Sequence, residues 1–87
     1  MLVHRNEFQR VRVGVTAGRS VGGAVQRNRA KRLLREAMRP LLPSVQPGWD
    51  VILIARQPLL SAAITEIRQV LVGLLARAHI VVQFDES

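Results

Sequence analysis

The sequence has no cysteine and no tyrosine among its 87 residues, and only 3% of them are aromatic. The absence of cysteine excludes disulfides, zinc sites built on thiolates and thiol catalysis, and it is compatible with a reducing compartment. No apolar run approaches the ~18 residues that a membrane-spanning helix needs. The amino terminus lacks the basic region, apolar core and cleavage site of a signal peptide, so we expect a cytoplasmic protein with no membrane partner.

Acidic residues and histidines are also few, and they are scattered. The six acids are Glu7, Glu36, Asp50, Glu66, Asp85 and Glu86, and the two histidines are His4 and His79. The acids lack the paired spacing that holds two metal ions for phosphodiester cleavage, and no serine has a local base to activate it. We interpret Asp50 as an edge or capping residue rather than an acid catalyst. The sequence therefore predicts a binding protein whose partner supplies any catalysis.

Positive charge is what the sequence has in excess. Thirteen lysine and arginine residues against six acids give a formal net charge of +7 at pH 7. Twelve of the thirteen are arginine, whose planar guanidinium binds phosphate with two hydrogen bonds and stacks on bases. A GC-rich genome explains the preference for arginine equally well, but not why seven of the cations lie between Arg19 and Arg39. This clustering favours nucleic acid, and less strongly an anionic membrane, as the partner.

Most of the clustered cations lie on a predicted amphipathic helix from Ala24 to Arg39, which Pro40 ends. Its apolar side has helical spacing and is predicted to be buried; it consists of Ala30, Leu33, Leu34, Ala37 and Met38, continuing to Leu41. The opposite side is basic and consists of Arg27, Lys31, Arg32, Arg35 and Arg39. Like charges three and four residues apart repel one another, and only Glu36 relieves the repulsion. A polyanionic partner is the simplest explanation of such a helix.

A glycine-rich passage, Thr16 to Gly23, leads into this helix. It lacks the Gly-Lys-Ser/Thr ending of a P-loop and the Gly-x-Gly-x-x-Gly spacing of dinucleotide folds, so we interpret its glycines as turn residues. The passage places the free N–H groups of the helix amino terminus beside Arg19 and Arg27, where a phosphate can bind.

Three segments have the composition of strands. Leu2–Arg5 and Arg10–Thr16 flank a polar turn and predict a hairpin, and valine alternates with polar residues in the second segment. Trp49–Ala55 is almost continuously apolar, which predicts a central strand covered on both faces. The strands before and after the basic helix form a βαβ unit and should be parallel. We interpret Phe8 as a turn residue that packs on the sheet rather than as a platform for base stacking.

The remaining segments are predicted to be scaffold. Pro43, Pro47 and Gly48 predict a stiff surface loop, and Ala62–Ala78 predicts a second helix. The apolar face of this helix consists of Ala63, Ile64, Ile67, Val70, Leu71, Leu74, Leu75 and Ala78. The tail, residues 79–87, is strand-like with an acidic end, and it is predicted to add an edge strand or to pair with another chain.

The segment from Arg12 to Ala37 resembles the protein subunit of bacterial ribonuclease P. The hallmark of that family is Arg-Asn-Arg-x-Lys-Arg-x-x-Arg on a helix, and it is matched by Arg27, Asn28, Arg29, Lys31, Arg32 and Arg35. The run Pro47 to Arg56 and the final helix also resemble the family. The resemblance covers about residues 11–78 of one domain, 1–87.

The resemblance implies an α+β fold: a two-layer α/β sandwich with a small mixed sheet, similar to that of ribosomal proteins. It also implies that the basic helix lies in a left-handed βαβ crossover, whereas general rules predict a right-handed one.

The resemblance implies that the chain binds a large catalytic RNA, which with Mg²⁺ removes the 5′ leader from precursor tRNA. The chain would then be a subunit of an endoribonuclease whose catalytic groups and Mg²⁺ sites belong mainly to the RNA and its substrate. Contacts to phosphates suit a row of guanidinium groups, because A-form RNA hides its base edges. We interpret Asn28 as an RNA contact rather than a helix cap. The predicted RNA-binding residues are Arg19, Arg27, Asn28, Arg29, Lys31, Arg32, Arg35 and Arg39, and no catalytic or metal-binding residue is predicted.

Two features depart from the family. Its members usually begin with a basic helix and a first strand that wall the cleft for the leader, whereas this chain starts later. We expect such an opened fold to favour strand exchange into a homodimer. Gly18-Arg19-Ser20 stands where the family commonly has Ser-Lys-Lys, so one cation of the pair is kept.

The alternative is another basic protein that binds structured RNA or DNA without a catalytic role. A helix-turn-helix needs a short turn between two helices, and a loop and a strand follow the basic helix here. A membrane-surface module would need aromatic or leucine anchors beside the cations, and the basic side has none.

Overall fold

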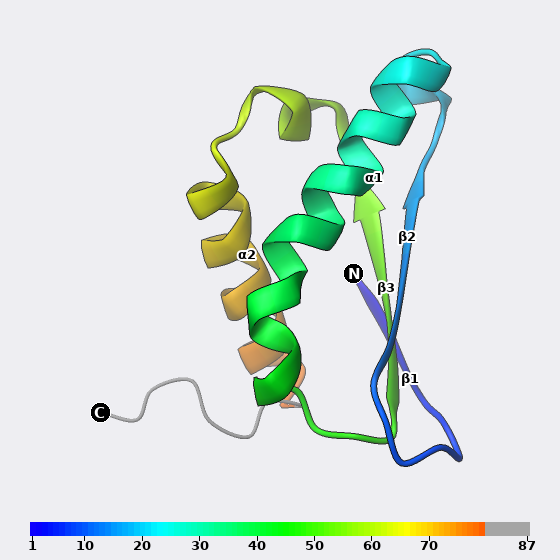
Figure 1. The fold of residues 1–87 in the computed structure, drawn as a ribbon, viewed down its shortest axis with the longest axis vertical. Helices are drawn as coiled ribbons and strands as arrows, with labels where there is room; N and C mark the ends of the chain where they lie inside the picture. Colours follow the sequence, from blue (N-terminus) through cyan, green and yellow to red (C-terminus); the bar gives the residue numbers. More distant parts are fainter. Residues whose placement is uncertain (80–87) are drawn as a thin grey trace.

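A three-stranded sheet forms one layer of the fold, and two helices form the other (Figure 1). The computed structural model describes residues 1–79, so the predictions for the tail lie outside the described residues. The elements are β1 (Leu2–Arg5), β2 (Arg12–Ala17), α1 (Ala24–Met38), β3 (Trp49–Ala55) and α2 (Ile64–Arg77). Short 3-10 turns cover Arg19–Val21, Arg39–Ser44 and Gln57–Ser61.

The strand order is β1-β3-β2, with β2 parallel and β1 antiparallel to β3. The predicted βαβ unit and the central position of β3 are confirmed. The predicted hairpin is wrong, because β1 and β2 pair with opposite edges of β3. Their connection passes the start of β3, where the Asn6 N–H donates to the Gly48 carbonyl (2.8 Å) and the Gly48 N–H donates to the Arg10 carbonyl (3.1 Å).

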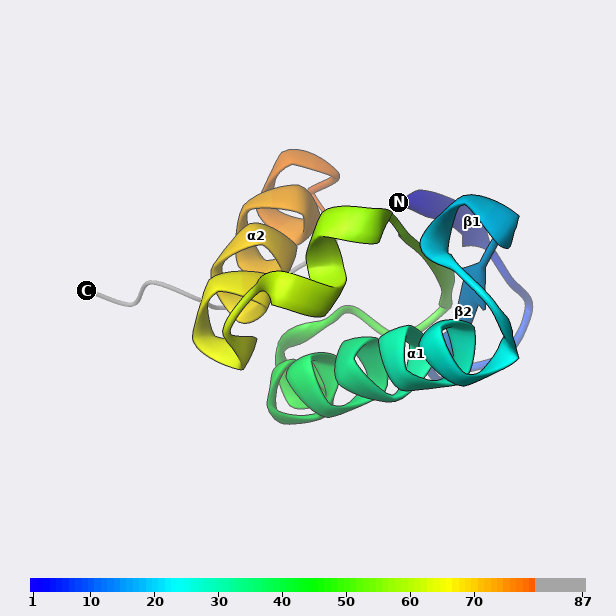
Figure 2. The ribbon, with the colours of Figure 1, turned by 90° about the horizontal axis from the view of Figure 1, so that it is seen from above.

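The crossover that carries α1 is left-handed, as the family resemblance implied. In Figure 1, α1 lies in front of the sheet with β2 and β3 both pointing upward, and the chain passes from β2 on the right to β3 on its left. Figure 2 shows from above that α1 lies on one side of the sheet. α1 packs on β2 and β3, and α2 packs mainly on α1.

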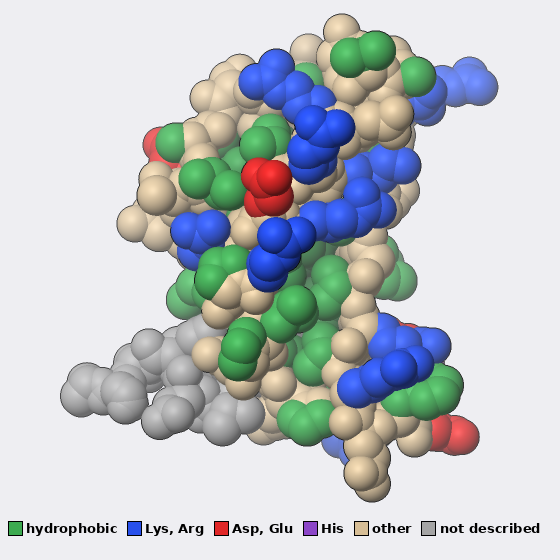
Figure 3. Space-filling view, viewed as in Figure 1, with side chains coloured by type: hydrophobic (Ala, Val, Ile, Leu, Met, Phe, Trp, Pro, Cys, Tyr) green, Lys and Arg blue, Asp and Glu red, His purple; other side chains and the backbone are tan. Residues whose placement is uncertain are grey.

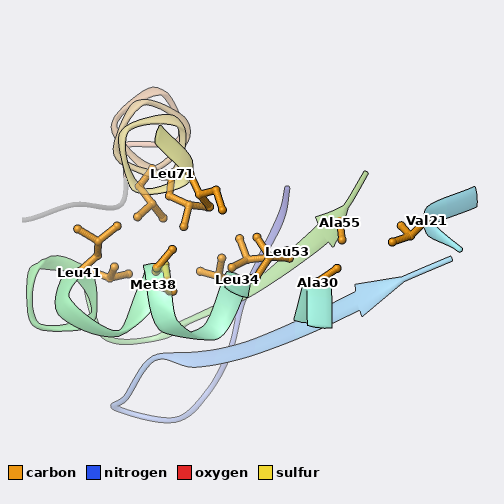
Figure 4. Packing of buried hydrophobic residues seen from close by; sticks show 13 residues of the cluster. Val21, Ala30, Leu34, Met38, Leu41, Leu53, Ala55 and Leu71 are labelled. Carbon is orange, nitrogen blue, oxygen red and sulfur yellow. The ribbon is translucent and has the colours of Figure 1, made fainter. Parts of the chain in front are cut away.

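The core between the layers is aliphatic (Figure 4). From β3 it takes Val51, Leu53 and Ala55, which alternate along the strand and face the helices. The intervening Ile52 points to the other face and is 38% exposed, beside the exposed Leu2 and Gly14 of the neighbouring strands. β3 is therefore covered on one face only, which corrects the prediction of cover on both.

The helices bury the predicted sides with two differences. On α1 the buried residues are Ala30, Leu34, Ala37 and Met38. On α2 they are Ile67, Leu71 and Leu75, whereas Val70 is 60% exposed and Ala63 is exposed, contrary to prediction.

The segment after α1 also differs from prediction. Pro40 turns the chain into a 3-10 segment, from which Leu41 enters the core, followed by Val45. The predicted surface loop thus closes the bottom of the core. Among the described residues, no helix has the length and apolarity required to cross a membrane.

Candidate nucleic-acid interface

The loop from β2 into α1 is fixed by one buried residue and two glycines. Val21 is 2% exposed and anchors the 3-10 turn on the core. Gly22 has φ +139°, and a Cβ there would lie 2.9 Å from the Cβ of Gln26, so only glycine fits. Gly23 is the N-cap, and its carbonyl accepts the first helical hydrogen bond from the Arg27 N–H (2.9 Å).

The N-cap position excludes one of the two interpretations of Asn28, the helix cap. Because Gly23 starts the helix, Asn28 lies in the second turn and does not cap it. Its side chain is exposed and makes no hydrogen bond within residues 1–79. The amide is therefore free to meet a ligand.

The predicted interface residues lie in the loop, along α1 and just beyond its end, where Figure 3 shows a run of lysine and arginine side chains. Arg27 and Lys31 are half-buried, and the other six are exposed. Asn28, Arg32, Arg35 and Arg39 follow one another at spacings of four, three and four residues and therefore form a row along the helix. This row is about 17 Å long from Asn28 to Arg39, at 1.5 Å per helical residue. Arg29 flanks the row on one side, and the half-buried Arg27 and Lys31 flank it on the other.

These cations lack intramolecular partners in the described part of the chain. None of the seven lysine and arginine side chains from Arg19 to Arg39 forms an ion pair or a hydrogen bond there. Glu36, the one carboxylate on α1, is exposed and unpaired as well. The repulsion along this surface is relieved when phosphates bind, which makes it a favourable site for a polyanion.

A second group of charged residues lies at the opposite end of β2. Asp50 accepts hydrogen bonds from Arg12 Nε (2.8 Å) and Nη2 (2.7 Å) and from Asn6 Nδ2 (2.7 Å). The bonds from Arg12 and then from Asn6 lower the pKa of Asp50 from its ordinary 3.8 to about 2. Asp50 thus makes structural contacts at the start of the central strand β3, and it is unsuited to donate a proton near neutral pH.

Aromatic rings accompany this second group. The Arg12 guanidinium lies 4.4 Å and that of Arg10 5.5 Å from the Phe8 ring centre, and Arg5 lies 5.2 Å from the Trp49 ring centre. Phe8 lies in a turn as predicted, and its ring lies against Arg12 of β2 and against Arg10, outside the core. Sequence analysis missed the grouping, and the alternation of Arg10 and Arg12 beside Phe8 was its only local signal.

The described residues do not supply a metal site. No three of the histidine, aspartate or glutamate side chains within residues 1–79 lie close enough together to hold a metal ion. Asp50, the acid with the most hydrogen bonds, is already engaged by Arg12 and Asn6.

Comparison with known sequences gives a consistent family. The ribonuclease P family model matches residues 1–79. A ribonuclease P protein component from Dehalococcoides mccartyi is 41% identical over 82 residues, covering 94% of this chain and 67% of that protein. The one from Symbiobacterium thermophilum is 52% identical over 67 residues, covering 77% of this chain and 58% of that protein. The chain thus spans about three fifths to two thirds of the length of these relatives.

Solved structures agree with the sequence comparison. The RNase P protein from Thermotoga maritima superposes with a TM-score of 0.76 at 30% identity, covering 87% of this chain and 73% of that one. The RNase P protein from Staphylococcus aureus gives a TM-score of 0.73 at 30% identity, covering 90% and 72%. With the family match across all the described residues, the chain belongs to the ribonuclease P protein family.

Proposed function

We propose that this chain is the RNA-binding protein subunit of a ribonuclease P, assisting a catalytic RNA in the cytoplasm to remove the 5′ leader from precursor tRNA. The observation that carries the proposal is the position of the family hallmark. Asn28, Arg29, Arg32 and Arg35 are exposed on the side of α1 away from the core, and Arg27 and Lys31 are half-buried at its border. None of the six has a partner among residues 1–79.

The proposed contacts are to phosphates. The Cβ atoms of residues three and four apart on a helix lie about 5–6 Å from one another, close to the spacing of successive phosphates along an RNA strand. Arg29, Lys31, Arg32 and Arg35 supply affinity, Asn28 adds a directional hydrogen bond, and Arg19 and Arg27 hold phosphate near the amino terminus of α1. Arg39 extends the row at the other end.

The contribution to cleavage follows from charge. Folded RNA brings phosphates together, and Mg²⁺ must neutralise them when no other cation does. Seven unpaired cations between Arg19 and Arg39 replace part of that requirement. The protein is therefore proposed to lower the Mg²⁺ concentration at which the RNA folds and cleaves, while the catalytic Mg²⁺ ions are bound by the RNA and the precursor tRNA.

Reconstitution of precursor-tRNA cleavage with the cognate RNA tests the proposal. Cleavage is measured across a Mg²⁺ titration with the RNA alone, with the chain added, and with an Arg29→Ala/Arg32→Ala variant added. We expect the chain to shift the titration to lower Mg²⁺ and the variant to lose most of that shift. Cleavage that depends on Mg²⁺ in the same way with and without the chain would contradict the proposal.

A matched control separates the effect of losing contacts on α1 from the effect of lowering the net charge of the chain. An Arg56→Ala/Arg77→Ala variant loses the same two charges from exposed positions outside α1. We expect it to shift the titration as the unaltered chain does. Duplex DNA of equal charge, added as a competitor, should displace the chain from the RNA only at much higher concentration.

A further inference from the structure

Both aromatic residues in the part of the chain that the structure describes lie at one end of the sheet. The core is aliphatic throughout, so neither Phe8 nor Trp49 supplies its main packing. Phe8 is 46% exposed and lies against Arg10 and Arg12, while Trp49 is half-buried beneath Arg5. An exposed phenyl ring next to two arginines has the composition of a surface that stacks nucleobases.

The loop that carries Phe8 is held in place at several points. The Phe8 N–H donates to Asn6 Oδ1 (2.8 Å), and Asn6 Nδ2 donates to Asp50 (2.7 Å). Gly48, whose φ is +94°, forms backbone hydrogen bonds with Asn6 and Arg10, which precede and follow Phe8 in the sequence. The ring is therefore presented on an ordered support, which lowers the entropy cost of binding a ligand.

The charges around the ring favour an anionic ligand. Asp50 neutralises Arg12 and fixes its guanidinium against Phe8. Arg5 and Arg10 have no carboxylate partner within residues 1–79. Arg10 beside the exposed ring and Arg5 over Trp49 at the end of β1 thus remain available for the phosphates that flank a stacked base.

The position of this group places it within reach of the same RNA as α1. In Figure 3 a second group of basic side chains lies below the run over α1 on the same face, at the place of the β1–β2 connection in Figure 1. α1 runs back along β2, so the group is near the carboxyl end of α1, in the direction in which Arg39 extends the row. One RNA molecule can touch both surfaces.

We propose that Phe8 is a stacking platform for an unpaired nucleotide of the RNA partner, with Arg5 and Arg10 contacting the phosphates beside it. The inference deepens the proposed function and rests on it. A duplex does not satisfy this site, because its bases are already stacked on one another. The unpaired nucleotide comes either from the catalytic RNA or from the 5′ leader of the precursor tRNA.

Substitutions at Phe8 test the platform by RNA affinity. Phe8→Ala and Phe8→Leu remove the aromatic ring, and Phe8→Tyr keeps it. Stacking on one base changes affinity by about 5-fold to about 150-fold, so the first two variants should bind the RNA that much more weakly and Phe8→Tyr should bind as the unaltered chain does. Thermal unfolding of each variant checks that the loop is still folded. Affinity unchanged in Phe8→Leu would overturn the inference.

A fluorescence variant tests stacking directly and keeps the two proposals distinguishable. In Trp49→Phe/Phe8→Trp the single tryptophan is at the platform. Hexauridylate and hexaadenylate should quench its emission, whereas a twelve-pair RNA duplex added at the same total phosphate concentration should not. If the duplex quenches the emission as strongly as the single strands, or if neither single strand quenches it, the proposal that Phe8 stacks a base is wrong. Loss of RNA binding in Arg29→Ala/Arg32→Ala would meanwhile still support the interface on α1.

Three RNAs then identify the source of the nucleotide. Quenching is measured with the catalytic RNA alone, with precursor tRNA and with mature tRNA that lacks the leader. Quenching by the catalytic RNA alone assigns the nucleotide to that RNA. Quenching by precursor but not mature tRNA assigns it to the leader. Quenching by none of the three overturns the inference.

Discussion

Asp50 is held by side chains from two other parts of the chain. It lies near the start of the central strand β3 and is paired on both sides, with His4 of β1 and Arg12 of β2. Its partners, Arg12 and Asn6, lie 38 and 44 positions away, so nothing in the local pattern identifies them. They meet only because the β2–β3 register sets Arg12 opposite Asp50. The same holds for Phe8. Arg10 and Arg12 are close to it in the sequence, but only the structure shows which of the surrounding arginines lack a carboxylate partner.

We predict that Asp50 makes stability depend on pH in the acid range. Its pKa falls from 3.8 to about 2 on folding, so the charged form stabilises the fold above its ordinary pKa and this contribution disappears as pH falls through about 2. Asp50→Asn should therefore unfold at a lower temperature than the unaltered chain at pH 6. The gap should narrow steadily between about pH 4 and about pH 2. Thermal unfolding followed by circular dichroism measures it.

The matched control for Asp50→Asn removes a carboxylate whose side chain has no partner in the described residues. Glu36 is exposed and makes no ion pair in the described part of the chain, so Glu36→Gln removes a carboxylate of the same charge without breaking a hydrogen bond. A gap for Asp50→Asn that stays constant down to pH 2 would show that the Arg12 pair does not operate in solution.

At the scale of elements, periodicity predicts helices well and strand partners poorly. The bounds predicted for α1 differ from those observed by one residue, because Pro40 and the apolar spacing both act locally. For β3 the continuous apolar run predicted the bounds of the strand correctly, but it wrongly predicted that both faces of the strand are covered. Ile52 is apolar and still 38% exposed, so composition alone does not show whether a second layer exists. The prediction of a hairpin was wrong because the six residues between β1 and β2 are enough for the chain to pass the end of β3 and pair with its other edge.

α1 as an element leads to a prediction about salt. Phosphate contacts release counterions, so each lost contact should flatten the plot of log affinity against log salt by about one unit. Arg29→Ala/Arg32→Ala should thus weaken RNA binding and reduce the slope by about two if both side chains contact phosphate. Filter binding at several salt concentrations measures both quantities. An unchanged slope would rule out direct phosphate contact by these two arginines.

At the scale of the whole molecule, the two helices are joined by one polar contact that no sequence pattern reveals. Arg68 of α2 donates from Nε to the Ala37 carbonyl (3.1 Å) and from Nη2 to the Glu36 carbonyl (3.5 Å). These carbonyls belong to the last turn of α1, where helical partners are missing. The contact therefore ends α1 and attaches α2 to it, and it supports the part of the helix that carries Arg35 and Arg39.

We predict that Arg68→Met lowers the free energy of unfolding by about 1–3 kcal/mol, because it leaves these carbonyls without a charged donor. Methionine keeps most of the packing, so the loss reports the hydrogen bonds. Arg68→Lys should recover part of the loss. Urea denaturation measures the change, and equal stability of Arg68→Met and the unaltered chain would show that the contact contributes nothing.

The strand order also determines when the sheet can form as the chain leaves the ribosome. Within the described sheet, β1 and β2 each pair only with β3, so neither has a partner until Ala55 has emerged. At about 5–20 residues per second, the 38 residues from Ala17 to Ala55 take roughly 2–8 s to synthesise. The nascent chain thus presents its arginine-rich helix to the surroundings of the ribosome, itself an assembly of RNA, before the sheet that will support that helix exists.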